Sequence, residues 1–206
     1  MILEAAFLIG LGLSVGLSGA LIPGPLLVYT INESLKKGRW TGLQVILGHA
    51  IVEVFVVILL AAGLSRVMSS EKFFSAISLL GGGMLIYMGA RSLKEKDARL
   101  ELKEKVSYGL IFGGSFFTAF NPSFPLWWAT AGVRLLMEGY MVAGFLGVGL
   151  VVAGHWLADF GWYAMVSHII ATKARLISEK GWYKKIRTAL SLILIAIGAY
   201  FLSTVF

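Results

Sequence analysis

The sequence predicts an all-α fold: a polytopic membrane protein of six transmembrane helices, built as an inverted 3+3 repeat with proline-broken first and fourth helices. The first observation is composition. A chain of 206 residues that is 58% hydrophobic and 14% charged, with a mean hydropathy of +0.83, does not suit folding in water around one core. The second is a set of six apolar runs of spanning length. The third is a motif that occurs once in each half.

The six runs are separated by charged and glycine-rich segments. A transmembrane helix needs about 20 apolar residues, each rising about 1.5 Å. The runs lie at 4–31, 42–65, 73–92, 107–133, 141–168 and 187–206. The first has no basic segment before it and continues past the small residues where a signal peptide would be cut, so we expect it to be retained as a span.

The distribution of Lys and Arg predicts the orientation. The first, third and fifth loops hold 3, 6 and 6 of these residues, whereas the second and fourth hold 2 and 1. Because cytoplasmic loops carry the basic excess, we expect the odd-numbered loops inside the cell and both termini outside. The protein would then be a multi-pass protein of the cell membrane. Since the basic residues lie in loops, the net charge of +7 does not indicate a nucleic-acid partner.

The first run is long enough to be broken into two helices. Residues 4–31 would form about 42 Å of straight helix, against a hydrocarbon core of about 30 Å. Proline removes a backbone donor but suits the first position of a helix. We therefore predict a break at Gly24-Pro25 and a half-helix running toward Lys37, with Gly38 as its C-terminal stop.

The second and fifth runs carry the repeated motif. "GHAIVE" in the second matches "GHWLAD" in the fifth. The i, i+4 spacing places His49 beside Glu53 and His155 beside Asp159. An ionisable side chain in hydrocarbon costs at least about 2.5–3.5 kcal/mol, so each pair needs a partner or a function. We predict that both pairs face one interior cavity. The alternative interpretation is a structural hydrogen bond between helices in each place.

The fourth run has a proline break of its own. "NPSFP" at 121–125 corresponds to "IPGP" at 22–25, and these two segments contain all four prolines of the chain. Asn121 is a good N-cap and Pro122 a good first residue, so a half-helix would begin there and present free N–H groups inside the membrane. The simpler alternative is an ordinary proline kink in each run.

The third and sixth runs carry no such motif and complete two units of three spans. We assign 1–92 to the first repeat, 93–106 to a charged cytoplasmic linker and 107–206 to the second repeat. Because three is odd, the second unit would enter the membrane upside down relative to the first. That inverted repeat is typical of many secondary transporters.

Together these features predict a site for a substrate with two opposite charges. Helix N-termini that converge from opposite sides would bind a carboxylate. The residues that would form this carboxylate site lie at the two helix breaks: Pro23, Gly24, Pro25, Asn121 and Pro122. Glu53 and Asp159 would hold an ammonium group or carry a coupled proton, and the two histidines would adjust their charge. A zwitterionic amino acid satisfies both halves of the site.

Transport of a divalent metal is the competing interpretation, because imidazole and carboxylate groups suit several first-row ions. The ligands would be His49, Glu53, His155 and Asp159. Two helix N-termini at the same cavity argue against a cation. An enzyme is not expected, since the chain has neither HExxH nor GxSxG, and no cofactor is expected. The absence of cysteine excludes thiolate sites. The expected partners are a small-molecule substrate and the lipid bilayer, and homo-oligomer formation is left open.

Two stretches resemble a known family. "PGPLLVYTINESLKKGRWTGLQVILGHAI" resembles the first signature of the LysE/RhtB family of amino-acid exporters, and "GGSFFTAFNPSFPLWWATAG" is similar to the second. The resemblance implies a six-span exporter of basic or neutral amino acids, driven by the proton gradient or the membrane potential. Ser123 follows Asn121-Pro122 where many members have lysine, and the His–carboxylate pairs are not a general family feature.

Overall fold

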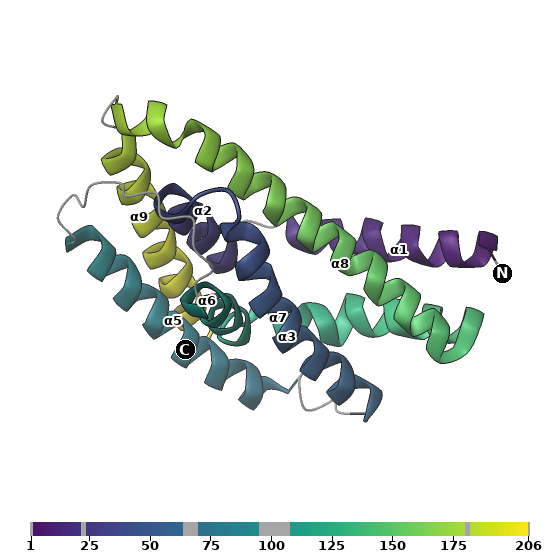
Figure 1. Cartoon of the computed structure of the whole chain (residues 1–206). Helices are drawn as coiled ribbons and strands as arrows, with labels where there is room; N and C mark the ends of the chain where they lie inside the picture. Colours follow the sequence, from purple (N-terminus) through teal and green to yellow (C-terminus); the bar gives the residue numbers. More distant parts are fainter. Residues whose placement is uncertain (1, 22–23, 64–69, 95–107, 180–181, 206) are drawn as a thin grey trace.

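The computed structural model describes residues 2–21, 24–63, 70–94, 108–179 and 182–205, and in these ranges every regular element is a helix. The predicted all-α class is therefore confirmed for the described part of the chain. The helices are α1 (Ile2–Ala20), α2 (Pro25–Lys37), α3 (Thr41–Ala61), α5 (Glu71–Lys94), α6 (Tyr108–Ala119), α7 (Ser123–Trp127), the π-helical turn η1 (Trp128–Gly132), α8 (Val133–Glu179) and α9 (Trp182–Ser203) (Figure 1).

Five of the described segments are long and apolar enough to cross a membrane. They are Ile2–Ala20, Thr41–Ala61, Glu71–Lys94, Ser123–Ala174 and Lys184–Ser203. Gly109–Ala119 is a shorter apolar helix. The long segment Ser123–Ala174 is interrupted by non-helical backbone at Ala143 and Gly144, where Figure 1 shows α8 turning back on itself. These segments are those of a multi-pass membrane protein.

Both predicted helix breaks lie in the expected places. α1 ends at Ala20 and α2 begins at Pro25, while α6 ends at Ala119 and helix resumes at Ser123. Gly38 follows α2 with a φ of 91°, which glycine adopts without strain, and its N–H donates to the carbonyl of Ser34. The chain can therefore leave α2 sharply and enter α3.

Two predicted boundaries were wrong. The loop expected at 134–140 is helical, and the turn lies later, at Ala143–Gly144. Gly144 has a φ of 58°, so the residue that permits the left-handed conformation decides where the reversal occurs. The fifth run also extends beyond residue 168, because α8 continues to Glu179. Of the expected linker at 93–106, residues 93–94 complete α5 and the rest lies outside the described residues.

Three helix pairs organise the packing. α1 packs mainly on α8, α3 on α6 and α5 on α9. Figure 1 shows α1 and α8 running side by side on one flank of the molecule, with α5 and α9 together on another.

Glycines allow all three pairs to approach at the backbone, and in two of the pairs the glycine belongs to the repeated motif. A Cβ at Gly48 of α3 would overlap the carbonyl oxygen of Ile111 in α6, and a Cβ at Gly154 of α8 would overlap that of Ile9 in α1. Gly48 and Gly154 are the first residues of the two copies of the motif. The α3–α6 and α8–α1 contacts therefore use the same position of the repeated motif in the same way.

The partner helices contribute a second matched pair of contacts. A Cβ at Gly114 of α6 would overlap the carbonyl oxygen of Val45, and one at Gly12 of α1 would overlap that of Val151. Val45 and Val151 each stand three residues before the motif glycine of their helix. Small residues at such crossings let membrane helices pack by close van der Waals contact.

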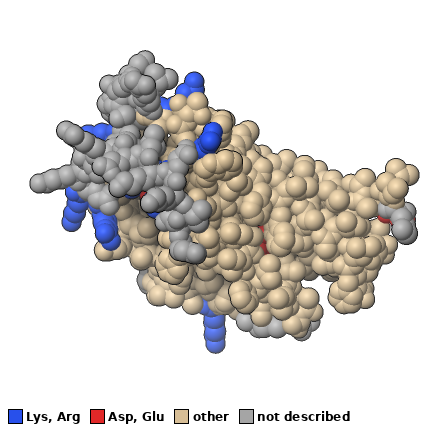
Figure 2. Space-filling model, viewed as in Figure 1, with Lys and Arg blue, Asp and Glu red and all other residues tan. Residues whose placement is uncertain are grey.

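Basic side chains gather at one end of the molecule. α2 and α5 finish there with Lys36, Lys37, Arg91 and Lys94 in their last turns, which also suits the negative ends of the helix dipoles. Figure 2 shows most of the visible Lys and Arg over this end, and the remaining visible surface is largely uncharged. The charge distribution is that of a protein with one polar face and an apolar body.

Candidate functional site

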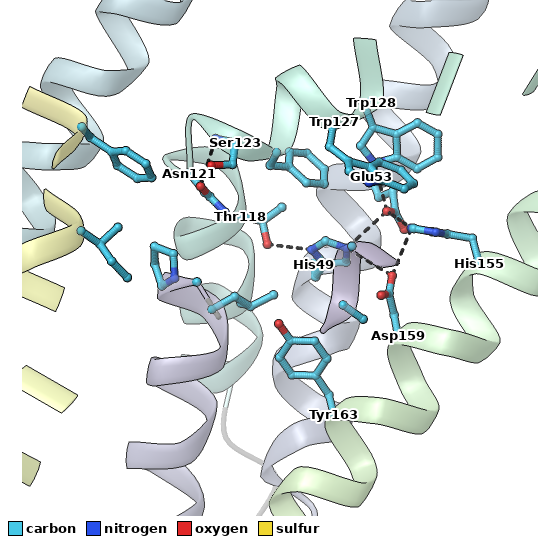
Figure 3. Close-up of a pocket in the computed structure, with 18 of the residues that line it drawn as sticks. His49, Glu53, Thr118, Asn121, Ser123, Trp127, Trp128, His155, Asp159 and Tyr163 are labelled. Atoms are coloured by element: carbon cyan, nitrogen blue, oxygen red, sulfur yellow. Dashed lines mark hydrogen bonds and ion pairs between the residues drawn. The ribbon is translucent and has the colours of Figure 1, made fainter. Parts of the chain in front are cut away.

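The two His–carboxylate pairs meet in the interior between α3 and α8. One ligand atom from each of His49, Glu53, His155 and Asp159 lies within 4.8 Å of all the others. Glu53 is fully buried, and His155 and Asp159 are each 4% exposed. Figure 3 shows the four side chains pointing toward one another from their two helices. The i, i+4 spacing read from the sequence is what places each pair on one helix face.

Glu53 is surrounded by donors. Its Oε1 accepts from the indole N–H of Trp128 at 3.1 Å, and His155 Nε2 lies 2.8 Å from the same oxygen. Its Oε2 accepts from the indole N–H of Trp156. His49 Nε2 is a further 3.2 Å neighbour of Oε1. A buried carboxylate with this many donors is well compensated for its loss of water, so the Glu53 side chain is held in a fixed position.

Asp159 occupies the position in the second copy of the motif that Glu53 occupies in the first, but its hydrogen bonding differs. Its Oδ2 lies 3.2 Å from His155 Nε2 and 3.5 Å from His49 Nε2. Neither contact has hydrogen-bond geometry, so this buried oxygen has no hydrogen-bond partner among the described residues. A buried acceptor without a donor costs free energy, about 1–3 kcal/mol in mutational data. Asp159 is therefore the carboxylate that can accept a hydrogen bond from a ligand.

Thr118 of α6 fixes the orientation of His49. The Thr118 hydroxyl donates to the carbonyl of Gly114 at 2.7 Å, and His49 Nδ1 lies 3.0 Å from the hydroxyl oxygen. Because the hydroxyl has a single proton, this arrangement makes His49 Nδ1 the donor. A neutral His49 would then turn the lone pair of Nε2 toward Glu53 and Asp159. Because a lone pair and a carboxylate repel each other, Nε2 needs either a second proton or a cationic group between it and the two carboxylates.

Two tryptophans complete the wall, and sequence reasoning missed both. Trp128 is fully buried in the π-helical turn η1, and the absence of a side chain at Gly132 leaves space for its ring. Trp127 stacks on His155 with ring centroids 5.1 Å apart. The signal available was "PLWW", directly after the second proline break. A π-turn shifts the register of the residues that follow, which cannot be read from periodicity.

The cluster borders a cavity of about 290 Å³. The start of α2 lies on it, with Gly24 and Pro25, and so do Asn121, Thr118 and Tyr163. No side chain caps the first turn of α2. The backbone N–H groups at the start of that helix are therefore available to a ligand in the cavity.

The start of α7 differs from that of α2. Asn121 Oδ1 accepts from the N–H of Ser123 at 3.1 Å, and the Asn121 carbonyl accepts from the N–H of Phe124 at 3.0 Å. Pro125 has no N–H. The first donors of α7 are thus already used within the turn. Pro122 is buried but does not line the cavity, and Pro23 lies outside the described residues.

The apolar body with several spanning helices and a polar cluster buried between them defines a multi-pass membrane protein with an interior site. The sequence pattern of the LysE type translocator family matches residues 17–204. The chain belongs to this family, which confirms the resemblance seen in the two signatures, and the family consists of transporters rather than enzymes. No curated protein and no solved structure matches the chain.

Proposed function

We propose that this protein exports an amino acid from the cytoplasm through the cavity bordered by His49, Glu53, His155 and Asp159. One observation carries the proposal: the same cavity is bordered by a carboxylate with an unused acceptor, on Asp159, and by the uncapped start of α2. A helix N-terminus favours an anion, and a buried carboxylate favours a cation. An amino acid supplies both groups in one molecule.

The substrate would lie between these two ends. Its α-carboxylate would accept from backbone N–H groups that follow Pro25, and its ammonium would donate to Asp159 Oδ2. Glu53 would supply a fixed negative charge, since its oxygens are already engaged by Trp128 and Trp156. The N–H of Ser123, the first free donor of α7, already donates to Asn121 Oδ1. Asn121 and Pro122 would therefore contribute to carboxylate binding through the dipole of the helix that they precede. The volume of about 290 Å³ is near the lower end of ordinary ligand pockets, about 300–1,000 Å³.

We propose an inverted repeat, 1–92 and 107–206, joined by the linker 93–106. The matched glycine contacts support it, because α3 packs on α6 with the same motif position that α8 uses on α1. The pairing of α5 with α9 fits elements that face each other across a pseudo-two-fold axis. In this arrangement each half supplies one His–carboxylate pair to the site.

We propose that the basic end faces the cytoplasm of the cell and that both termini lie outside. The gathering of Lys36, Lys37, Arg91 and Lys94 at one end supports this orientation. Export would draw on the proton gradient or the membrane potential. The position of His49, which needs a cationic neighbour or a second proton at Nε2, supports the four-residue cluster as the place where a coupled proton binds.

Export of a divalent metal is the second candidate, favoured by the approach of four ligand atoms to within 4.8 Å. Two features count against it. Glu53 Oε1 already has Trp128 and His155 on its lone pairs, and a metal would have to displace one of them. The uncapped start of α2 also repels a cation in the same cavity.

Uptake into energised, inside-out membrane vesicles tests the proposal. The labelled panel is lysine, arginine, threonine and leucine, with manganese and cadmium measured separately. We expect saturable movement of at least one amino acid that unlabelled metal does not compete away, loss of this activity in Asp159→Asn, and retention in the control Glu71→Gln, an exposed carboxylate of α5. Metal movement without amino-acid movement would overturn the proposal in favour of the second candidate.

A further inference from the structure

A second cavity of about 230 Å³ lies toward the basic end, between α2, α5 and α9. Its charged lining comes from α2 and α5, and Ser191 of α9 adds a hydroxyl. Tyr29, Asn32, Glu33 and Lys36 are spaced i, i+3, i+4 and i+7 and so share one face of α2. Arg91 faces them from the last turn of α5. This cavity is separate from the four-residue cluster.

Some of the polar and charged groups around this cavity have no partner among the described residues. Glu33 pairs with Lys37 at 2.9 Å and with Lys36 at 3.4 Å, and its side chain is 12% exposed. Arg91 has no ion pair among the residues that the structure describes. The Asn32 Oδ1 atom is buried and has no hydrogen-bond partner in the described part of the chain. The cavity thus presents an unsatisfied acceptor, a carboxylate and an available guanidinium.

These groups select a ligand with both a donor cation and an anion. An ammonium group fits the Asn32 oxygen and Glu33, while a carboxylate fits the fork of Arg91 donors. The lining also includes the apolar residues Met84, Met88 and Leu190, which can accept an aliphatic side chain. A free amino acid has this combination of groups.

The two cavities are neighbours along the same helices. Val28, Phe117 and Leu194 line the second cavity and are almost fully buried. The first cavity is lined by the nearby residues Leu26, Thr118 and Ile197 of the same helices. The Tyr29 ring stacks on Phe117 with centroids 4.6 Å apart. The two cavities are therefore bordered by neighbouring residues of α2, α6 and α9, and the buried side chains of Val28, Phe117 and Leu194 lie on the second.

We propose that the second cavity is a loading site on the cytoplasmic side, which binds the same amino acid before it passes Phe117 to the central site. This inference rests on the proposed function and adds a second binding site to it. Asn32 and Glu33 bind the ammonium group, and Arg91 binds the carboxylate. Phe117, held by Tyr29, closes the path between the two sites.

Equilibrium binding to the purified full-length protein in phosphatidylcholine nanodiscs tests this site. The probes are radiolabelled lysine, arginine, threonine and leucine, and the measured quantity is moles bound per mole of chain. We compare wild type with Asn32→Leu, Arg91→Gln, Asp159→Asn and the double variant Asn32→Leu/Asp159→Asn. Lys94→Gln, in the same helical turn as Arg91 but outside the cavity, is the matched control.

We expect two bound molecules in wild type and in Lys94→Gln, one in each single variant of the two sites, and none in the double variant. A single molecule that Asp159→Asn removes and that Asn32→Leu and Arg91→Gln leave in place would overturn the loading site while the proposed function stands. A single molecule that Asn32→Leu and Arg91→Gln remove, but that Asp159→Asn retains, would support the loading site and contradict the central one. No binding in wild type would overturn both.

Discussion

His155 Nε2 lies 2.8 Å from Glu53 Oε1 and joins two residues that are 102 positions apart. The contact connects the two copies of one motif, because Glu53 is the last residue of the first copy and His155 is the second residue of the second copy. Each copy therefore completes the environment of the other. The polar site forms only when the two halves of the chain are packed together.

The two carboxylates should respond differently to neutral substitution. Asp159→Asn should reduce transport at least tenfold and should lower thermal stability less than Glu53→Gln, because Oδ2 loses only its contacts with two histidines and no hydrogen bond. Glu53→Gln should reduce both transport and thermal stability, since the glutamine NH2 group would face the indole donor of either Trp128 or Trp156 and leave that N–H without an acceptor. Vesicle transport and thermal unfolding in detergent check the pair. Equal losses of stability in both variants would contradict the distinction.

Removing one indole donor should destabilise the protein. Trp128→Phe leaves Glu53 Oε1 with one donor fewer in a buried position, which we expect to cost about 1–3 kcal/mol. For a chain of this size, 1 kcal/mol corresponds to about 2–4 °C in the unfolding midpoint. The control is Trp40→Phe, at a position that is 52% exposed. If the hydrogen bond is the cause, Trp128→Phe should lower the stability less in the Glu53→Gln variant than in the wild type.

The glycine crossings should tolerate no side chain. Gly48→Ala and Gly154→Ala place a Cβ against the backbone of Ile111 and Ile9, and we expect each to lower stability by about 1–3 kcal/mol. Gly83→Ala is the matched control, because nothing lies within 4 Å of its added Cβ. Alanine there should be neutral or stabilising, as expected for an open helical position. Similar unfolding midpoints for all three variants would argue against the close crossings.

The orientation can be tested with single cysteines, because the natural chain has none. A membrane-impermeant maleimide should label Ile2→Cys in intact cells, since this position is 87% exposed near the N-terminus. Lys94→Cys, at the basic end, should be labelled only after the membrane is permeabilised. The reverse pattern would place the basic end outside, against the positive-inside rule.

Spacing and backbone chemistry made much of this arrangement predictable. The i, i+4 intervals put His49 beside Glu53 and His155 beside Asp159, and the two proline segments interrupt helices where expected. The repeated motif led to the expectation that both pairs share a cavity, and all four side chains border it. These features depend on local geometry, which a sequence carries directly.

Features set by tertiary packing were not predictable in the same way. From the sequence alone, a loop at 134–140 is as plausible as a turn at Gly144, and tertiary packing determines which of the two forms. The π-turn that turns Trp128 toward Glu53 has no periodic signal. The difference between Glu53 and Asp159 also arises from neighbours on other helices, so identical motif positions gave no indication of it.

The measurement that tests the central claim most directly is a crystal structure of the protein with its transported amino acid, together with anomalous diffraction from a crystal soaked in manganese. The account predicts amino-acid density in the central cavity, with its carboxylate at the start of α2 and its ammonium at Asp159 Oδ2, and no anomalous peak there. An anomalous peak coordinated by His49, Glu53, His155 and Asp159, with no amino-acid density in the cavity, would contradict it.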